Sequence, residues 1–193
     1  MFEKDISKEA LNDLPLQRYE GKIIVVTEID KVAQAVEEIN RHPVVGFDTE
    51  RRPSFNKGEF HSISLLQVAI PEKAFLFRLK FTGFPKLLTS IFTNSKIKKV
   101  GVGIKDDLIF LQQIAPFEPH SMIDLNEIAA DLAIKCSGAR KLTGLILGYR
   151  ISKNQQISNW DLPKLSDKQL NYAALDAHIC LAIYQKLAHW GYL

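Results

Sequence analysis

Two carboxylates stand two residues apart at the end of an apolar run. The run Val44–Phe47 is followed by Asp48, Thr49 and Glu50. Because side chains alternate between the two faces of a strand, Asp48 and Glu50 point the same way. Two like charges on one face of a buried strand cost free energy unless a cation lies between them. The pattern indicates a metal site, although two solvated turn residues would give the same Asp-x-Glu.

A third acid follows a buried strand that we expect at residues 98–103. Asp107 lies in a helix expected at residues 106–114, on the face that turns toward the sheet. That face also carries Phe110, Leu111 and Ile114. Its neighbour Asp106 is expected to cap the helix through its carboxylate, and a capping role is also the plain alternative for Asp107. The Gly-x-Gly before them lacks the third glycine of a dinucleotide-binding loop.

The fourth acid lies in the clearest element of the sequence. An apolar stripe predicts one long helix that packs on the sheet and begins after the cap Ser166, with Asp167 in its first turn. The stripe consists of Leu170, Ala173, Ala174, Ala177, Leu181, Tyr184 and Leu187. Tyr172 and Asp176 are four residues apart on this helix, so they are neighbours on one face. Alone, this pair is most often a surface hydrogen bond, but the four acids in this order can converge on one cleft.

The remaining residues supply the elements that must position these acids. We expect an N-terminal arm over residues 1–21, with a short helix at 6–16, and a single domain over residues 22–193. Three strands should form an antiparallel meander, at residues 44–50, 61–70 and 73–79. Further strands are expected at 23–26 and 122–125, and further helices at 29–39, 85–93, 125–134 and 142–149. The result is an α/β fold, a mixed sheet of five to six strands flanked by helices.

Length, composition and charge place the chain among ordinary soluble domains. Its 193 residues fit one domain, and a hydrophobic content of 46% indicates neither disorder nor a membrane protein. A net charge of +3 permits a polyanionic partner without requiring one. The N-terminus has no signal-peptide pattern, and the two cysteines, Cys136 and Cys180, have no metal-type spacing. We therefore expect a cytoplasmic protein with both thiols buried and no zinc site or disulfide.

Three blocks of this sequence resemble the motifs of the 3'-5' exonucleases of the DEDD superfamily, in its tyrosine-bearing (DEDDy) branch. The blocks are Phe47–Glu50, Gly101–Asp107 and Tyr172–Ala177. The segment Ser158–Pro163 is similar to the approach to the third motif in the exonuclease domain of the Werner syndrome type and in ribonuclease D. The resemblance runs from about Lys22 to Leu187, nearly the whole domain, and implies a ribonuclease-H-like fold.

The resemblance implies a complete catalytic set. The metal ligands fall on Asp48, Glu50, Asp107 and Asp176, and the residue that orients the attacking water falls on Tyr172. Oxygen ligands of this kind favour Mg²⁺ or Mn²⁺, two ions per site, and the expected product is a nucleoside 5'-monophosphate. Our hypothesis is that Asp48 bridges both ions, that Glu50 and Asp176 complete the ion carrying the attacking water, and that Asp107 serves the leaving-group side.

The histidine-bearing branch of the superfamily would place a histidine five residues before the last acid. This chain has Asn171 there, and His178 lies beyond Asp176 on a different helical face. The sequence therefore favours Tyr172 over any histidine.

Residues that contact the nucleic acid are expected in the segment after the first acids. The candidates are Thr49, Arg51, Phe60, His61, Leu65 and Lys105, with Phe55, Arg52 and Lys141 as further ones. For the apolar members a core position is the alternative. The resemblance implies that the substrate is the 3' end of single-stranded DNA or RNA. A protein partner is a further expectation as the source of substrate grip, because this sequence lacks the helicase, polymerase or helical domains found in the family.

Two other functions on the same fold stay open. One is a catalytically weak nucleic-acid-binding or scaffold module, whose mark would be a lost acid. The other is an endonuclease, which would cut a circular single strand.

Overall fold

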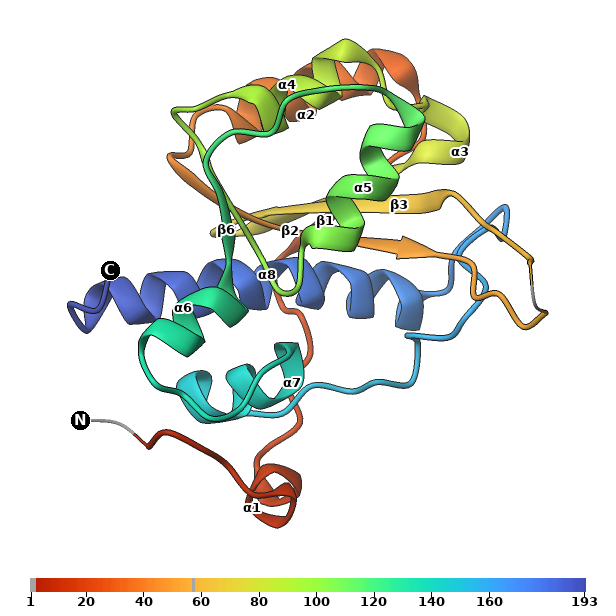
Figure 1. Cartoon of the computed structure of the whole chain (residues 1–193). Helices are drawn as coiled ribbons and strands as arrows, with labels where there is room; N and C mark the ends of the chain where they lie inside the picture. Colours follow the sequence, from red (N-terminus) through yellow and green to blue (C-terminus); the bar gives the residue numbers. More distant parts are fainter. Residues whose placement is uncertain (1–2, 57) are drawn as a thin grey trace.

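A mixed sheet of six strands runs through the protein, in the order β1-β4-β3-β2-β5-β6 (Figure 1). The computed structural model describes residues 3–56 and 58–193, so the first two residues of the predicted arm 1–21 lie outside the described residues. The strands are β1 (Lys22–Val26), β2 (Val44–Arg51), β3 (Ile63–Ile70), β4 (Lys73–Arg78), β5 (Lys98–Gly101) and β6 (Met122–Asp124). β2, β3 and β4 form the predicted antiparallel meander, and the other pairings are parallel. The predicted fold class is confirmed.

Helices cover both faces of the sheet (Figure 1). One face carries α2 (Ile29–Ile39), α3 (Leu79–Thr82), α4 (Lys86–Thr93) and α5 (Lys105–Ile114). The other carries α8 (Asp167–His189), with α1 (Lys8–Asp13), α6 (Leu125–Asp131), α7 (Ala139–Leu142) and a π-helical turn η1 (Thr143–Leu147) beyond it. None of the described helices is long and apolar enough to cross a bilayer. Two apolar cores, one on each side of the sheet, hold these layers together.

Helix α8 lies close to β2 because a glycine faces it. A Cβ at Gly46 would lie 2.1 Å from the carbonyl oxygen of Ala177 and 2.8 Å from the backbone nitrogen of Leu181. Both atoms belong to the helix backbone, so no change of rotamer relieves the contact. Asp176 directly precedes Ala177 in α8, so this close approach also sets the distance between Asp176 and β2.

We predict that Gly46→Ala moves α8 away from the sheet. It should destabilise the protein by about 1–3 kcal/mol, the usual cost of overpacking. It should also reduce the stabilisation that we expect from a bound divalent cation, because Asp176 would no longer face Asp48. Thermal unfolding with and without Mg²⁺ measures both effects. Gly83→Ala is the control for destabilisation alone: a Cβ is strained at its φ of 63°, but the residue follows α3 and adjoins the core on the face of the sheet opposite α8. An unchanged Mg²⁺ response in Gly46→Ala would contradict the prediction.

The N-terminal arm packs along the α8 side of the molecule. Leu11 is buried, and its side chain fills the space above Gly144, where a Cβ would come within 2.3 Å of it. Further along, Leu16 forms an isolated parallel bridge with Arg150. The side chain of Asn171 holds the backbone of Tyr19 at both ends, accepting from its N–H at 3.1 Å and donating to its C=O at 2.8 Å. The arm is thus part of the folded surface.

Several predicted boundaries differ from the structure for local reasons. The arm helix covers only Lys8–Asp13, because Ser7 caps its start and Leu14 is extended. The strand predicted to reach residue 103 ends at Gly101, since Gly103 has a φ of 69°. The helix predicted at residues 142–149 is a short α-helix continued by the turn η1, which ends before Gly148 with its left-handed φ of 78°. The two cysteines are free and buried, as predicted.

Candidate active site

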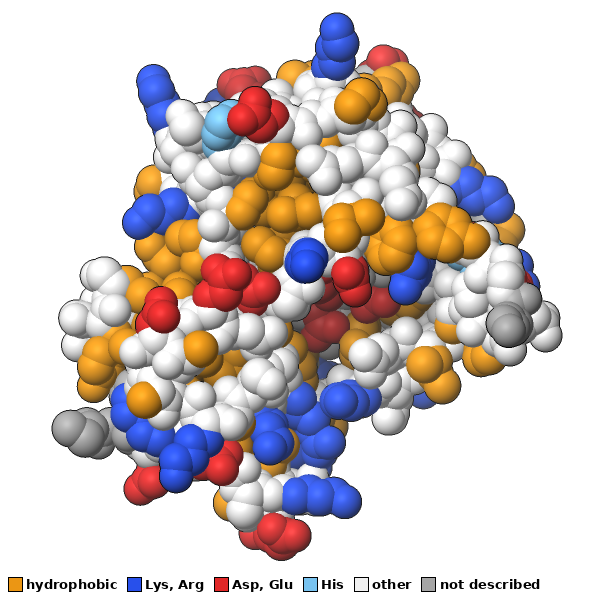
Figure 2. All heavy atoms as spheres, viewed as in Figure 1, with side chains coloured by type: hydrophobic (Ala, Val, Ile, Leu, Met, Phe, Trp, Pro, Cys, Tyr) orange, Lys and Arg blue, Asp and Glu red, His pale blue; other side chains and the backbone are white. Residues whose placement is uncertain are grey.

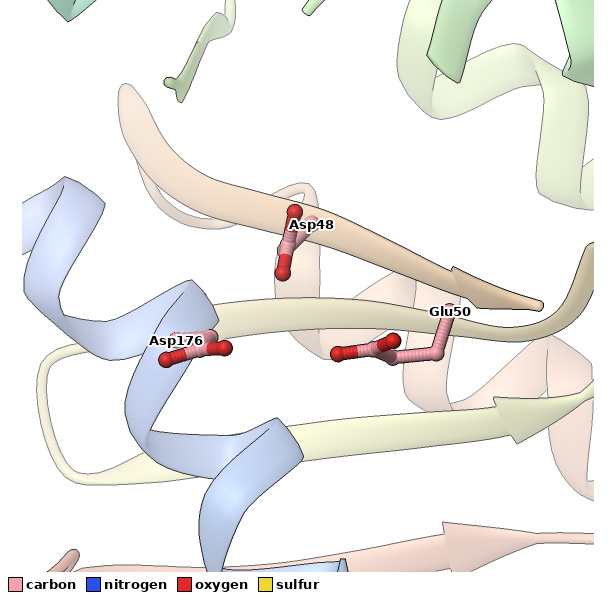
Figure 3. A group of neighbouring side chains, drawn as sticks. All are labelled: Asp48, Glu50 and Asp176. Carbon is pink, nitrogen blue, oxygen red and sulfur yellow. The ribbon is translucent and has the colours of Figure 1, made fainter. Parts of the chain in front are cut away.

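Three of the four predicted acids meet between β2 and α8. Asp48 and Glu50 leave the same face of β2, and Asp176 faces them from α8 (Figure 3). One carboxylate oxygen of each lies within 4.8 Å of the others. The alternation along β2 and the contact of α8 with that face produce this arrangement, so residues from both ends of the domain share one site.

The fourth acid, Asp107, lies beside this group on the first turn of α5. Its carboxylate accepts a hydrogen bond from the hydroxyl of Thr49, which lies between Asp48 and Glu50 in sequence. Among the described residues, the three-carboxylate group within 4.8 Å does not include Asp107. Its charge nevertheless raises the pKa of both Asp48 and Glu50, so the four acids form one electrostatic unit.

The start of α5 is held by a residue that the sequence analysis did not single out. Asp124 accepts hydrogen bonds from the backbone N–H groups of Gly103 and Ile104, at 2.9 and 3.1 Å. The predicted cap by Asp106 is wrong, because α5 begins at Lys105 and Asp106 lies exposed within its first turn. Asp124 is also the N-cap of α6, and this capping position is the sequence signal by which it could have been found.

The face of α5 that carries Asp107 turns toward the sheet over only part of the predicted length. Leu111 is fully buried, whereas Ile114 is 37% exposed at the end of α5. The inward face therefore ends before the last turn of the helix.

Burial and mutual repulsion oppose ionisation of these carboxylates. Burial raises the pKa of Asp48 well above its ordinary value, and the charges of Asp176 and Asp107 raise it further. The pKa of Glu50 rises to about 10, first through burial and then through the neighbouring carboxylates. Burial also raises the pKa of Asp176 to about 7 and that of Asp107 to about 6. Only an added positive charge lets all four ionise together.

The donor set fits a hard divalent cation. None of the ion pairs found in the described part of the chain includes one of the four carboxylates. Carboxylate oxygens without a basic partner are the ligands that Mg²⁺ and Mn²⁺ prefer, and a buried unpaired acid is otherwise costly. The residues present therefore match a metal site.

Tyr172 is fixed at the edge of this acid group. Its hydroxyl neighbours the Asp176 carboxylate one helical turn away, as their spacing predicted, and the two groups shift each other's pKa. Burial, followed by the charges of Asp176 and Glu50, raises the pKa of the phenol, so it stays neutral. The ring packs against the fully buried Trp160, with centroids 6.0 Å apart. The phenol can therefore give and accept hydrogen bonds but cannot act as a base.

A cleft of about 780 Å³ is lined by three of the four acids, Asp48, Glu50 and Asp176. Its lining also includes four basic residues, Lys8, Arg140, Lys141 and Lys153. Figure 2 shows Lys and Arg side chains gathered on the lobe below the acidic group. Of the four, only Lys141 was among the sequence candidates for phosphate contact. Lys8 was missed because nothing in the sequence indicates that the arm reaches the site.

The six predicted substrate-contacting residues divide into four that reach the surface or the cleft and two that are less available. Thr49 lines the cleft, and Lys105 is exposed at the start of α5. Arg51 lies over the ring of Phe110, 4.2 Å from its centroid, and Phe60 is 62% exposed and packs on the same ring.

The other two candidates are less available. The Nε2 of His61 lies 2.8 Å from the Glu59 carboxylate. Leu65 is fully buried in the core between β3 and α8, so the prediction that it contacts a base is wrong. The core alternative for this side chain is correct, because β3 is central and both its faces are covered.

Comparisons with known proteins agree with this geometry. Residues 23–190 match a family model described as 3'-5' exonuclease. The mouse bifunctional 3'-5' exonuclease/ATP-dependent helicase WRN is 33% identical over 198 residues, which cover 96% of this chain but only 14% of that protein. The EXO domain of Nibbler from Aedes aegypti superposes with a TM-score of 0.80 at 21% identity, covering 90% of this chain and 94% of that chain. RNase D from Escherichia coli superposes with a TM-score of 0.76 at 21% identity, and the match covers 91% of this chain and 47% of that chain. The likeness confirms the ribonuclease-H-like fold.

Proposed function

Because the chain belongs to the 3'-5' exonuclease family, we propose that it hydrolyses phosphodiester bonds from the 3' end of a nucleic-acid strand and releases nucleoside 5'-monophosphates. The observation that carries the proposal is the group Asp48, Glu50 and Asp176, whose oxygens converge within 4.8 Å without a basic partner. A mere structural role would not explain acids that burial makes so difficult to ionise.

We propose that the four acids hold two divalent ions, Mg²⁺ or Mn²⁺. Such ions, when bound, acidify a water and neutralise charge on the phosphate and on the departing 3' oxygen. The carboxylates Asp48, Glu50 and Asp176 would supply ligands from β2 and α8, and Asp107 would supply one from α5. The hydrogen bond from Thr49 holds Asp107 in place beside the other three.

Tyr172 would orient the attacking water, and we propose on this basis that the chain belongs to the tyrosine-bearing branch. The phenol is neutral and lies next to Asp176, so its hydroxyl can position a water by a hydrogen bond without removing its proton. Trp160 keeps the ring in place and excludes bulk water from that side. The basic wall of Lys8, Arg140, Lys141 and Lys153 would face the phosphates.

The experiment that tests the function uses matched strands of DNA and RNA, single- and double-stranded and labelled at the 5' end. With Mg²⁺ or Mn²⁺ we expect ladders that shorten from the 3' end, and no cutting of a circular single strand. Cutting of the circle would indicate an endonuclease. Binding of linear strands without shortening, whichever ion is added, would instead indicate a nucleic-acid-binding or scaffold module.

The setting of the activity is also a proposal. The chain spans 14% and 20% of the length of the first two curated relatives it matches, so further segments or a protein partner would supply additional substrate grip. We also propose a cytoplasmic location, which the two free cysteines support.

A further inference from the structure

A second cavity of about 510 Å³ lies next to the acid cleft, between the N-terminal arm and the first turns of α8. The two cavities have Ser152 and Tyr172 in common as lining residues. The two cavities therefore adjoin at Ser152 and Tyr172. Since Tyr172 stands at the reacting phosphate in the proposed function, the second cavity adjoins the place of that phosphate and is within reach of a neighbouring nucleotide.

The arm builds one wall of this second cavity. Leu16, Gln17 and Arg18 line it together with Lys168 and Asn171 of α8. This wall is firmly attached, because the N–H of Gln17 donates to the carbonyl oxygen of Arg150 at 2.9 Å and Asn171 holds the backbone of the residue after Arg18. The family match begins at residue 23, so the wall lies outside the matched segment.

The lining has the chemistry of a nucleotide site. Arg18 and Lys168 are exposed cations, and Asp167 is the one acid among the lining residues, which leaves a positive balance. The side-chain amides of Asn154 and Gln155 offer both donors and acceptors, whereas the amide of Asn171 already pairs with the Tyr19 backbone and that of Gln17 donates to Arg18. The apolar surfaces of Leu16 and Leu175 complete the lining. Cations for a phosphate, amides for base edges and an apolar surface for a base are the features that bind single strands.

We propose that this arm-built cavity is a subsite for single-stranded nucleic acid, in which Arg18 and Lys168 bind a backbone phosphate beyond Tyr172. The proposal rests on the proposed function for its substrate class, but not for its geometry. It assigns to the arm a direct part in holding the strand. The free nucleoside monophosphate has the same chemistry, so the experiment compares the two ligands.

Binding without hydrolysis tests the subsite. The full chain with Asp176→Asn, in the absence of divalent ions, is titrated with a labelled single strand about 12 nucleotides long. Adding Arg18→Ala and Lys168→Ala should weaken binding roughly tenfold and reduce the slope of log K against log salt by about 0.7 per lost phosphate contact. Lys80→Ala with Lys86→Ala is the matched control, because it removes the same charge from exposed positions on α3 and α4, across the sheet.

The outcomes separate the hypotheses. An equal loss in the control pair, or no change of salt slope in the Arg18 and Lys168 variant, would overturn the subsite. A tenfold loss for the nucleoside monophosphate with none for the strand would also overturn it and assign the cavity to free nucleotide. If the proposed function fails, wild-type protein releases no nucleotides from any strand, a result that this binding experiment does not depend on.

Discussion

Replacing Asp48 by asparagine should abolish nucleotide release and, in the metal-free protein, raise the melting temperature. Activity should fall at least roughly 10³-fold, because the variant loses a metal ligand and several kcal/mol of transition-state stabilisation with it. Stability should rise because the substitution removes a carboxylate whose ionisation is opposed by burial and by Asp176 and Asp107. A gain of about 1 kcal/mol corresponds to a rise of about 2–4 °C for a protein of this size.

The matched control is Asp106→Asn. Asp106 is the exposed neighbour of Asp107, so its loss removes a carboxylate near the site without removing one from it. Nucleotide release and thermal unfolding, with and without Mg²⁺, are measured on both variants. Mg²⁺ should stabilise the wild type and Asp106→Asn but have little effect on Asp48→Asn. If Asp48→Asn releases nucleotides at the wild-type rate, the metal assignment is wrong.

The same acids make the stability of metal-free protein depend on pH. The pKa of Glu50 rises from its ordinary 4.5 to about 10 on folding, so the folded state binds the proton more tightly than the unfolded state does. Its contribution to stability is complete below pH 4.5 and is lost as the pH rises toward 10. This loss between pH 4.5 and about 10 should diminish once Mg²⁺ is bound, because the ion compensates the ionised carboxylates.

Tyr172→Phe should lower kcat by roughly 10²-fold while leaving metal binding intact. The ring and its packing on Trp160 are retained, and only the hydroxyl that neighbours Asp176 is lost. Because the phenol stays neutral, its loss should lower kcat evenly across the pH range instead of removing one limb of the profile. Single-turnover rates on a labelled strand, measured from neutral to alkaline pH, test this.

Tyr184→Phe provides the comparison on the same helix. It also removes a phenol that forms a side-chain hydrogen bond, since the Tyr184 hydroxyl accepts from Lys98 Nζ at 2.8 Å. Its hydroxyl lies away from the acids, so kcat should stay near the wild-type value. Equal effects of the two substitutions would mean that Tyr172 stabilises the helix and does not orient a water.

Local patterns in the sequence were sufficient for the parts of the site that lie on one element. Alternation along a strand places Asp48 and Glu50 on one face, and helical spacing places Tyr172 beside Asp176. The apolar stripe predicted α8 from its Ser166 cap onward, and the structure has both. These patterns repeat over a few residues, so they can be read without knowledge of the rest of the fold.

Only the tertiary structure decided which elements meet. Asp176 reaches Asp48 because Gly46 lets the helix backbone approach β2, a contact between residues more than a hundred positions apart. Leu65 is buried because α8 covers its face of β3, although its sequence position suggested a surface role. The arm lines the second cavity because Asn171 and Arg150 hold it there. Such contacts depend on how layers pack over long sequence separations, and no local periodicity encodes them.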